Sequence, residues 1–147
     1  MLTLKRAIEI ATAAHEGQLD KGGRPYIEHP LAVMANVDGE DEQIVAVLHD
    51  VLEDTTVTVD DLRAEGATDR QVAGLLAVTR RDGEPYDDAV RRALSDPIGR
   101  VVKRADHEHN ADPARLALLP DDVAARLRRK YELVRPLFDA ICSPTQE

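Results

Sequence analysis

Apolar residues recur at intervals of three and four positions along almost the whole chain, whereas the strict alternation typical of β-strands is nearly absent. The first apolar stripe runs through residues 4–11. Thr3 precedes it as a suitable N-cap, and Gly17 favours a helix end. The pattern therefore predicts an all-α domain.

Turn residues divide the remaining chain into further helices. Pro30 suits the first turn of one helix, and the Asp96-Pro97 pair starts another. Pro136 is expected to kink or break the last helix. The predicted helices cover about residues 4–16, 31–37, 41–54, 59–64, 69–80, 85–94, 96–110 and 122–141, and the inward residues of the last are Val123, Leu127, Leu133, Val134, Leu137 and Phe138.

The chain length of 147 residues predicts a single compact domain. We expect this domain to span residues 1–142 and a frayed tail to span residues 143–147.

Ionisable side chains gather on one face of the segment 44–54. On a helical wheel with His49 at zero, Glu53 falls at about 40°, Asp50 at about 100° and Asp54 at about 140°. The aliphatic residues of the segment fall between about 160° and 320°. A solvated acidic face is the alternative, but the broad aliphatic side predicts a deeply embedded helix whose polar stripe faces a cleft. Three carboxylates in that cleft would repel one another without a cation.

A second polar edge occurs in the segment 101–110. With Asp106 at zero on the wheel, Asn110 lies at about 40° and Lys103 at about 60°. A carboxylate, an amide and an amine thus share one edge. Asp and Lys at this spacing also form ordinary surface ion pairs, so both interpretations stay open.

The other histidines differ in their expected roles. His29 precedes a proline, which favours an extended backbone from which the imidazole can point inward. His15 extends the first apolar stripe and is expected to be a hydrogen-bonded core residue. His109 is expected to be structural, and His107 could serve either role.

Composition narrows the classes of function. The net charge is -9, with four Lys/Arg against twelve Asp/Glu in residues 1–60, and no basic cluster with interleaved aromatics occurs. Nucleic acid is therefore not an expected partner. No apolar run is long enough for a bilayer and no secretory signal precedes the domain, so we expect a cytoplasmic protein that does not bind membranes. The single cysteine, Cys142, cannot form an internal disulfide, so any metal site must use His and carboxylates.

The order of these pieces resembles the HD superfamily of metal phosphohydrolases. It is more similar still to the hydrolase domain of the RelA/SpoT alarmone enzymes and to the stand-alone small alarmone hydrolases. The matching blocks are HEGQ at 15–18, PYIEHP at 25–30, LHDVLEDT at 48–55, and VKRAD at 102–106 followed by Asn110. The resemblance covers about residues 4–116 and implies a compact multi-helix HD fold.

The resemblance also implies a function and a set of site residues. The implied activity is removal of the 3'-pyrophosphate of guanosine tetra- or pentaphosphate, (p)ppGpp, by a metal-activated water. No alarmone synthesis is expected, because the match covers only the hydrolase region. By resemblance, His29, His49, Asp50 and Asp106 bind one divalent ion, usually Mn²⁺; Glu53 and Asp54 are the catalytic acidic pair; and Lys21, Lys103 and Asn110 contact the nucleotide.

One departure from the family pattern leaves alternatives open. Asp20 stands where the long alarmone enzymes carry an arginine that stacks on guanine. The chain could therefore be an HD phosphohydrolase of another nucleotide or dinucleotide phosphate. A non-catalytic nucleotide-binding module is a third possibility. The oligomeric state and regulatory partners do not follow from the sequence.

Overall fold

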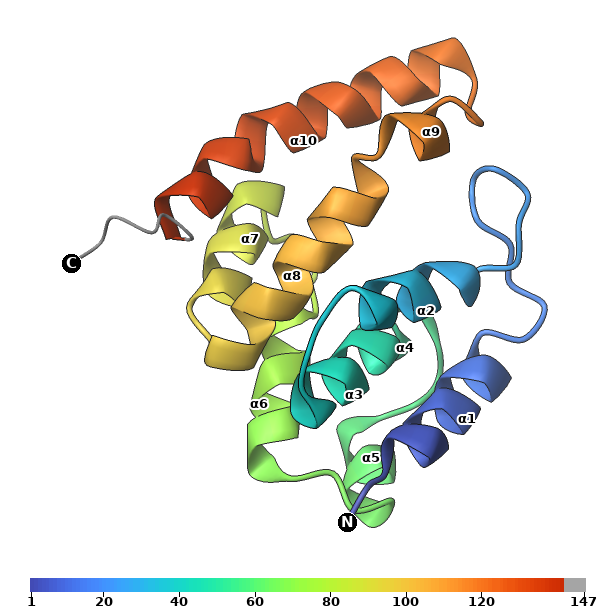
Figure 1. The fold of residues 1–147 in the computed structure, drawn as a ribbon, viewed down its shortest axis with the longest axis vertical. Coiled ribbons are helices and arrows are strands. Elements are labelled where there is room, and N and C mark those ends of the chain that lie inside the picture. The colour runs from blue at the N-terminus through green and yellow to red at the C-terminus, as the bar shows by residue number, and fades with distance from the viewer. Residues whose placement is uncertain (142–147) are drawn as a thin grey trace.

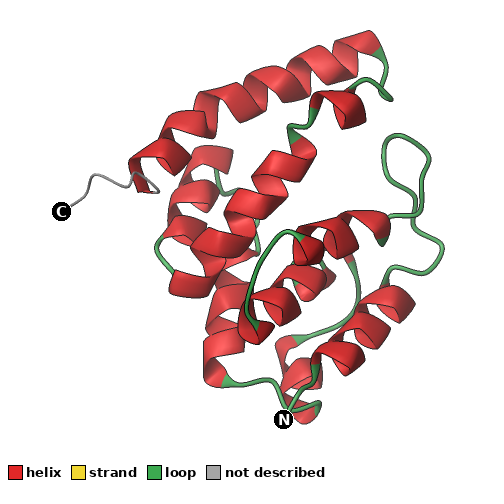
Figure 2. Cartoon of the chain, viewed as in Figure 1, coloured by secondary structure: helices red, strands yellow, loops and turns green. Residues whose placement is uncertain are grey.

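The computed structural model describes residues 1–141, which form helices joined by short loops (Figures 1 and 2). Within that range there is no β-strand, only an isolated antiparallel bridge between Leu19 and Pro25. The predicted all-α fold is confirmed. Cys142 and the predicted tail 143–147 lie outside the described residues. The helices are α1 (Leu4–Ala14), α2 (Glu28–Ala35), α3 (Glu40–Leu48), α4 (Val51–Asp54), α5 (Val59–Ala64), α6 (Asp69–Val78), α7 (Tyr86–Leu94), α8 (Pro97–Asn110), α9 (Pro113–Leu116) and α10 (Asp121–Ile141).

Side-chain caps explain where several helices begin. The Thr3 hydroxyl accepts a hydrogen bond from the backbone of the first turn of α1, as predicted. At α5, Thr58 and Asp61 each accept a hydrogen bond from the other's backbone N–H, which forms a capping box. Asp96 caps α8 and Pro97 occupies its first turn. Each cap satisfies backbone donors that the helix itself cannot pair.

Helix α3 is the centre of the main hydrophobic core. Every residue from Ile44 to Leu48 is fully buried, and α3 packs against α1, α2, α6 and α8. Burial of a Val, Leu or Ile side chain contributes roughly 1.5–3 kcal/mol, so this helix is firmly anchored on all sides. Its C-terminal end therefore holds the residues that follow, His49 and Asp50, in a fixed position.

The chain between α3 and α4 turns where a single helix over residues 41–54 was predicted, so that prediction is wrong in one respect. The imidazole Nδ1 of His49 donates a hydrogen bond to the Ala46 carbonyl at 2.6 Å, and the His49 backbone N–H donates to the same oxygen. This i to i−3 pairing tightens the backbone, and the helix resumes only at Val51. The turn alters the directions that the wheel assigned to the residues beyond Asp50.

Helix α10 crosses one end of the molecule, shown in orange and red in Figure 1, and packs against α7 and α9. Leu127, Val134 and Phe138 are buried there, as predicted. Leu133 is 75% exposed, so the prediction that it faces inward is wrong. Pro136 lies inside the helix without breaking it.

In residues 1–141, no helix combines the length and the apolar character needed to cross a membrane.

Candidate active site

Four of the predicted site residues converge at one point although they come from three parts of the fold. His29 lies on α2, His49 and Asp50 lie in the turn after α3, and Asp106 lies on α8. His29 Nε2 is 2.8 Å from Asp106 Oδ1 and 3.9 Å from Asp50 Oδ2. His49 Nε2 is 3.2 Å from Asp106 Oδ1 and 3.1 Å from Asp50 Oδ2. Both imidazoles therefore present Nε2 to the same two carboxylates.

The protonation of His49 shows what this cluster requires. Its Nδ1 must carry a proton, because that atom bonds to the Ala46 carbonyl. A neutral His49 would then direct the lone pair of Nε2 at two carboxylate oxygens, which is repulsive. Burial lowers the pKa of His49, but the charges of Asp50 and Asp106 outweigh burial and raise the pKa well above its ordinary value. The cluster thus calls for positive charge, either a second proton on His49 or a cation among the four side chains.

The donor set suits a divalent metal ion. His29, His49 and Asp50 each offer a ligand atom, and these atoms lie within 4.8 Å of one another. Asp106 Oδ1 contacts both histidine Nε2 atoms. Imidazole nitrogens combined with carboxylate oxygens suit Mn²⁺, Fe²⁺ or Zn²⁺, whereas a structural thiolate site needs cysteines. The residues present therefore fit the ion that the sequence predicts.

A further set of side chains holds the two carboxylates in place. Lys103 Nζ donates to Asp106 Oδ2 at 2.9 Å, and Asn110 Nδ2 donates to Asp106 Oδ1 at 3.1 Å. The Tyr26 hydroxyl donates to Asp50 Oδ2 at 2.7 Å. Burial raises the pKa of Asp106, but Lys103 and the two histidines lower it well below its usual range. Lys103 and Asn110, predicted as nucleotide contacts, thus also position a candidate metal ligand.

The side chain of His29 points inward as predicted, but its backbone is helical and not extended. The residue lies in the first turn of α2, so the extended backbone expected before Pro30 is not present. Its ring is 3% exposed and points into the cluster.

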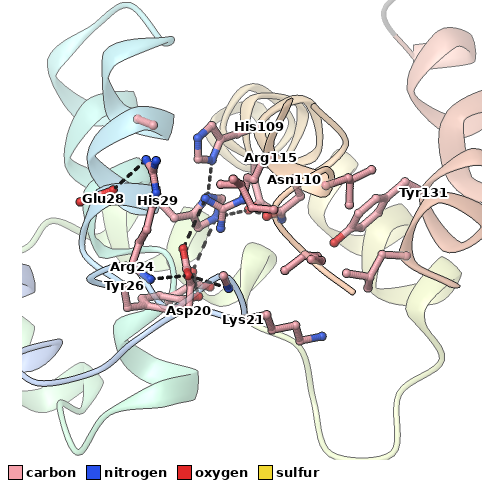
Figure 3. Close-up of a pocket in the computed structure, with 18 of the residues that line it drawn as sticks. Asp20, Lys21, Arg24, Tyr26, Glu28, His29, His109, Asn110, Arg115 and Tyr131 are labelled. Carbon is pink, nitrogen blue, oxygen red and sulfur yellow. Dashed lines mark hydrogen bonds and ion pairs between the residues drawn. The ribbon is translucent and has the colours of Figure 1, made fainter. Parts of the chain in front are cut away.

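The structure corrects the role predicted for His109. His109 lines the cavity, its ring stacks on that of His29, and the two Nδ1 atoms are 2.7 Å apart (Figure 3). One of these nitrogens donates to the other, so His109 fixes the ring orientation of a candidate ligand. His15 is buried and its Nδ1 is bonded to Gln18 Oε1, as expected of a core histidine. His107 packs against Phe138 instead of the site.

The two residues of the predicted acidic pair, Glu53 and Asp54, lie in different surroundings. Asp54 lines the cavity, and its pKa is raised by partial burial and by the charges of Asp50 and Glu53. Glu53 is exposed, does not line this cavity, and accepts a hydrogen bond from the Arg80 backbone N–H at 2.9 Å. The helical wheel had placed Glu53 nearer to His49 than Asp54. Because the chain turns at residues 49–50, Asp54 lines the cavity and Glu53 does not.

The cluster opens into a cavity of about 1140 Å³. Figure 3 shows Tyr26 and His29 on one side of it and Tyr131 on the other. Several lining residues were not identified from the sequence, because they come from helices that carry no recognisable motif. Of these, Gln18, Tyr26 and Glu28 lie within matching blocks but were given no role. The cationic lining residues are Lys21, Arg24, Lys103, Arg115 and Lys130, and the aromatic ones are Tyr26, Tyr86 and Tyr131.

The loop at residues 20–25 forms one rim of the cavity. Asp20 Oδ1 accepts hydrogen bonds from the backbone N–H groups of Gly22 and Arg24, both at 2.9 Å, and so shapes the loop. Asp20 Oδ2 lies 3.8 Å from a guanidinium nitrogen of Arg115. Lys21, predicted to contact the nucleotide, is exposed at this rim. Guanidinium groups are therefore present at the rim, from Arg24 of the loop and from Arg115 of α9.

The sequence is similar to one segment of much longer bacterial proteins. No family model matches the chain. A probable GTP pyrophosphokinase of Mycobacterium leprae (strain TN) is 36% identical over 151 residues, which covers 91% of this chain and 18% of that protein. The bifunctional (p)ppGpp synthase/hydrolase SpoT of Escherichia coli (strain K12) is 32% identical over 150 residues, with 91% and 21% covered. The chain spans about a fifth of the length of these relatives.

A solved structure matches the fold over nearly all of the chain. It is that of a metazoan ortholog of SpoT, described as hydrolysing ppGpp and playing a role in starvation responses. The TM-score is 0.75 at 20% sequence identity, with 97% of this chain and 86% of that chain covered. At this level of identity, the match shows that the two chains share a fold.

Proposed function

Because the chain is homologous to one segment of the RelA/SpoT (p)ppGpp synthase/hydrolases, we propose that it is a metal-dependent (p)ppGpp 3'-pyrophosphohydrolase of the HD superfamily. The reaction would release pyrophosphate and leave GDP or GTP. The observation that carries the proposal is the convergence of His29, His49, Asp50 and Asp106 beside a cavity whose lining includes both carboxylates and five Lys or Arg side chains. Such a cavity suits a polyphosphate substrate despite the net charge of -9.

The four converging side chains would hold one divalent ion, for which we propose Mn²⁺. When bound, such an ion lowers the pKa of a coordinated water toward neutrality and so supplies a nucleophile for attack on phosphorus. The chain contributes the orientation of its ligands. Lys103 and Asn110 hold Asp106, Tyr26 holds Asp50, and His109 holds His29.

Asp54 is the residue that we assign to proton transfer. It lines the cavity beside Asp50, and its raised pKa makes its carboxylate a better proton acceptor than that of an ordinary aspartate. Glu53, the other half of the acidic pair, would act indirectly. Its hydrogen bond to the Arg80 backbone fixes the segment that leads to Tyr86 in the cavity wall.

Nucleotide binding would use the cations of the cavity. Lys103 lies beside Asp106 and is placed to neutralise the phosphate next to the ion. Lys21 and Arg115 lie at the rim, where they can contact ribose, base or phosphate. Asn110 adds an amide on the same edge of α8.

The direct test is incubation of the protein with Mn²⁺ and ppGpp, followed by ³¹P NMR detection of pyrophosphate. We expect Asp54→Asn to retain the metal and to lose about 10²- to 10⁴-fold in kcat, the usual range for a general base. Asp60→Asn is the matched control, because Asp60 is an exposed residue of α5 that does not line the cavity. Absence of pyrophosphate release by metal-loaded protein would refute the proposed activity.

A second candidate is hydrolysis of another nucleotide or dinucleotide phosphate by the same centre. The observation that favours it is Asp20, whose carboxylate is engaged in the loop and cannot stack on guanine. Turnover of ppGpp compared with a phosphorylated adenine dinucleotide would decide between the substrates. A non-catalytic nucleotide-binding module would instead retain no Mn²⁺ after dialysis, as metal analysis would reveal.

A further inference from the structure

One wall of the cavity lies far along the chain from the candidate metal ligands. It consists of Tyr86 on α7 and of Lys130 and Tyr131 on α10, and we call it the α7–α10 wall. The ammonium of Lys130 lies 4.2 Å from the centre of the Tyr86 ring and 6.0 Å from that of Tyr131. The Tyr86 ring therefore holds this half-buried cation at the cavity wall.

Other cations approach the same ring. Lys103 Nζ lies 5.4 Å from the Tyr86 ring centre, and the Arg80 guanidinium carbon lies 6.0 Å from it. A cation–π contact explains why one lysine lies on a tyrosine. It does not explain why three cations gather around one ring, because their mutual repulsion opposes that arrangement.

Within the described part of the chain, the charge of Lys130 has no hydrogen-bonded or ion-paired partner, whereas the neighbouring cations Lys103 and Arg80 each have one. Lys103 is paired with Asp106 at 2.9 Å, and Arg80 Nε donates to the Glu84 carbonyl at 3.0 Å. Lys130 forms no ion pair or hydrogen bond with any of residues 1–141. Burial lowers the pKa of Lys130, and the charges of Arg80, Lys103 and Lys21 lower it further. An anion bound at the α7–α10 wall would relieve this repulsion.

We propose that the α7–α10 wall binds the phosphate group of the substrate that is not cleaved, with Lys130 as the specificity-determining cation. The inference rests on the proposed function for the identity of the substrate, a nucleoside phosphorylated at two positions. Lys103 connects the two ends of the site, because it contacts Asp106 and also faces the Tyr86 ring. One phosphorylated arm thus lies at the candidate metal centre while the other lies against Lys130.

Binding of GDP to the full chain in the presence of EDTA tests this assignment without any catalytic step. We expect Lys130→Met, which keeps the apolar stem and removes the charge, to weaken GDP binding about tenfold or more, in line with the loss of a hydrogen bond to a charged group. Guanosine, which has no phosphate, should bind both proteins equally. Arg129→Met is the matched control, since it makes the same charge change at an exposed neighbour that does not line the cavity. Lys130→Arg should restore most of the affinity.

The second measurement is steady-state hydrolysis of ppGpp with Mn²⁺. We expect Lys130→Met to raise KM about tenfold and to leave kcat within about threefold, because the lysine contacts the arm that does not react. Equal GDP affinity in the wild type and Lys130→Met, or equal losses in Lys130→Met and Arg129→Met, would overturn the assignment. If ppGpp is not hydrolysed at all, the proposed function fails, whereas a Lys130-dependent difference in GDP binding would still support the phosphate site.

Discussion

Asp106 has two roles that a pair of substitutions can separate. Its Oδ1 contacts both candidate histidine ligands and Asn110, and its Oδ2 pairs with the buried Lys103. Asp50, the other carboxylate of the cluster, is 18% exposed and accepts its closest hydrogen bond from Tyr26. Both should be needed for metal binding, but only Asp106 should be needed for the stability of the metal-free protein.

The expected magnitudes follow from burial. Asp106→Asn leaves Lys103 buried without its counter-ion, and breaking a buried pair in this way costs about 3–5 kcal/mol. For a chain of this size that corresponds to a fall in Tm of about 6–20 °C. Asp50→Asn removes a charge that is partly exposed and that attracts His49 while it repels Asp106, so we expect a smaller loss, below about 3 kcal/mol.

Urea unfolding in EDTA and again with Mn²⁺ measures both roles. The wild type should gain about 2.7 kcal/mol when the free Mn²⁺ concentration is a hundred times its Kd, and neither variant should gain measurably at that concentration. The reasoning is refuted if Asp106→Asn is within about 1 kcal/mol of the wild type in EDTA. It is also refuted if Asp50→Asn loses as much stability as Asp106→Asn, since the two sites would then not differ in burial as the structure describes.

Two further predictions concern contacts around the site. His109→Ala removes the partner of the His29 Nδ1, so Mn²⁺ affinity measured by titration should fall about 10- to 100-fold while the circular dichroism spectrum stays unchanged; unchanged affinity would contradict the positioning role. The side chain of Arg92 holds the pKa of Glu84 at about 2, below its ordinary value near 4.3. The stability that this pair contributes is therefore present above pH 4.3 and is lost as the pH falls through about 2. Glu84→Gln should flatten the dependence of Tm on pH across that interval, and an acid limb identical to that of the wild type would count against it.

Helices with strong local signals could be predicted closely from the sequence. The observed α5 coincides with the predicted range 59–64, because the threonine cap and the short apolar stripe lie within a few residues of each other. Helix α8 begins directly after the Asp96 cap and ends at Asn110, as its capping aspartate, its proline and its periodicity indicate. In such segments the determining contacts are local, so tertiary packing confirms what the residues already favour.

The turn at His49 and Asp50 could not be predicted in the same way. Neither a glycine nor a proline marks it, and both residues keep right-handed helical backbone angles. A side-chain contact accompanies the turn: the His49 imidazole forms a hydrogen bond with the Ala46 carbonyl, while its other nitrogen faces Asp106 of the distant helix α8. A wheel that assumes a continuous helix therefore placed Glu53 closer to the site than the structure does.

The two ends of the cavity differed in how far they could be identified because they are assembled differently. The candidate metal ligands lie within short motifs that occur in a recognisable order, so they can be identified from the sequence alone. Lys130 and Tyr131 lie on a helix whose apolar residues, Leu127, Val134 and Phe138, form a buried stripe. Such a stripe indicates packing against the core and gives no sign of a binding site. Only the packing of α10, which brings both residues into the cavity lining, suggests the role that we propose for them. Under the proposed function, changes in α7 and α10 should therefore alter the choice of substrate, whereas changes in the candidate metal ligands should affect every substrate alike.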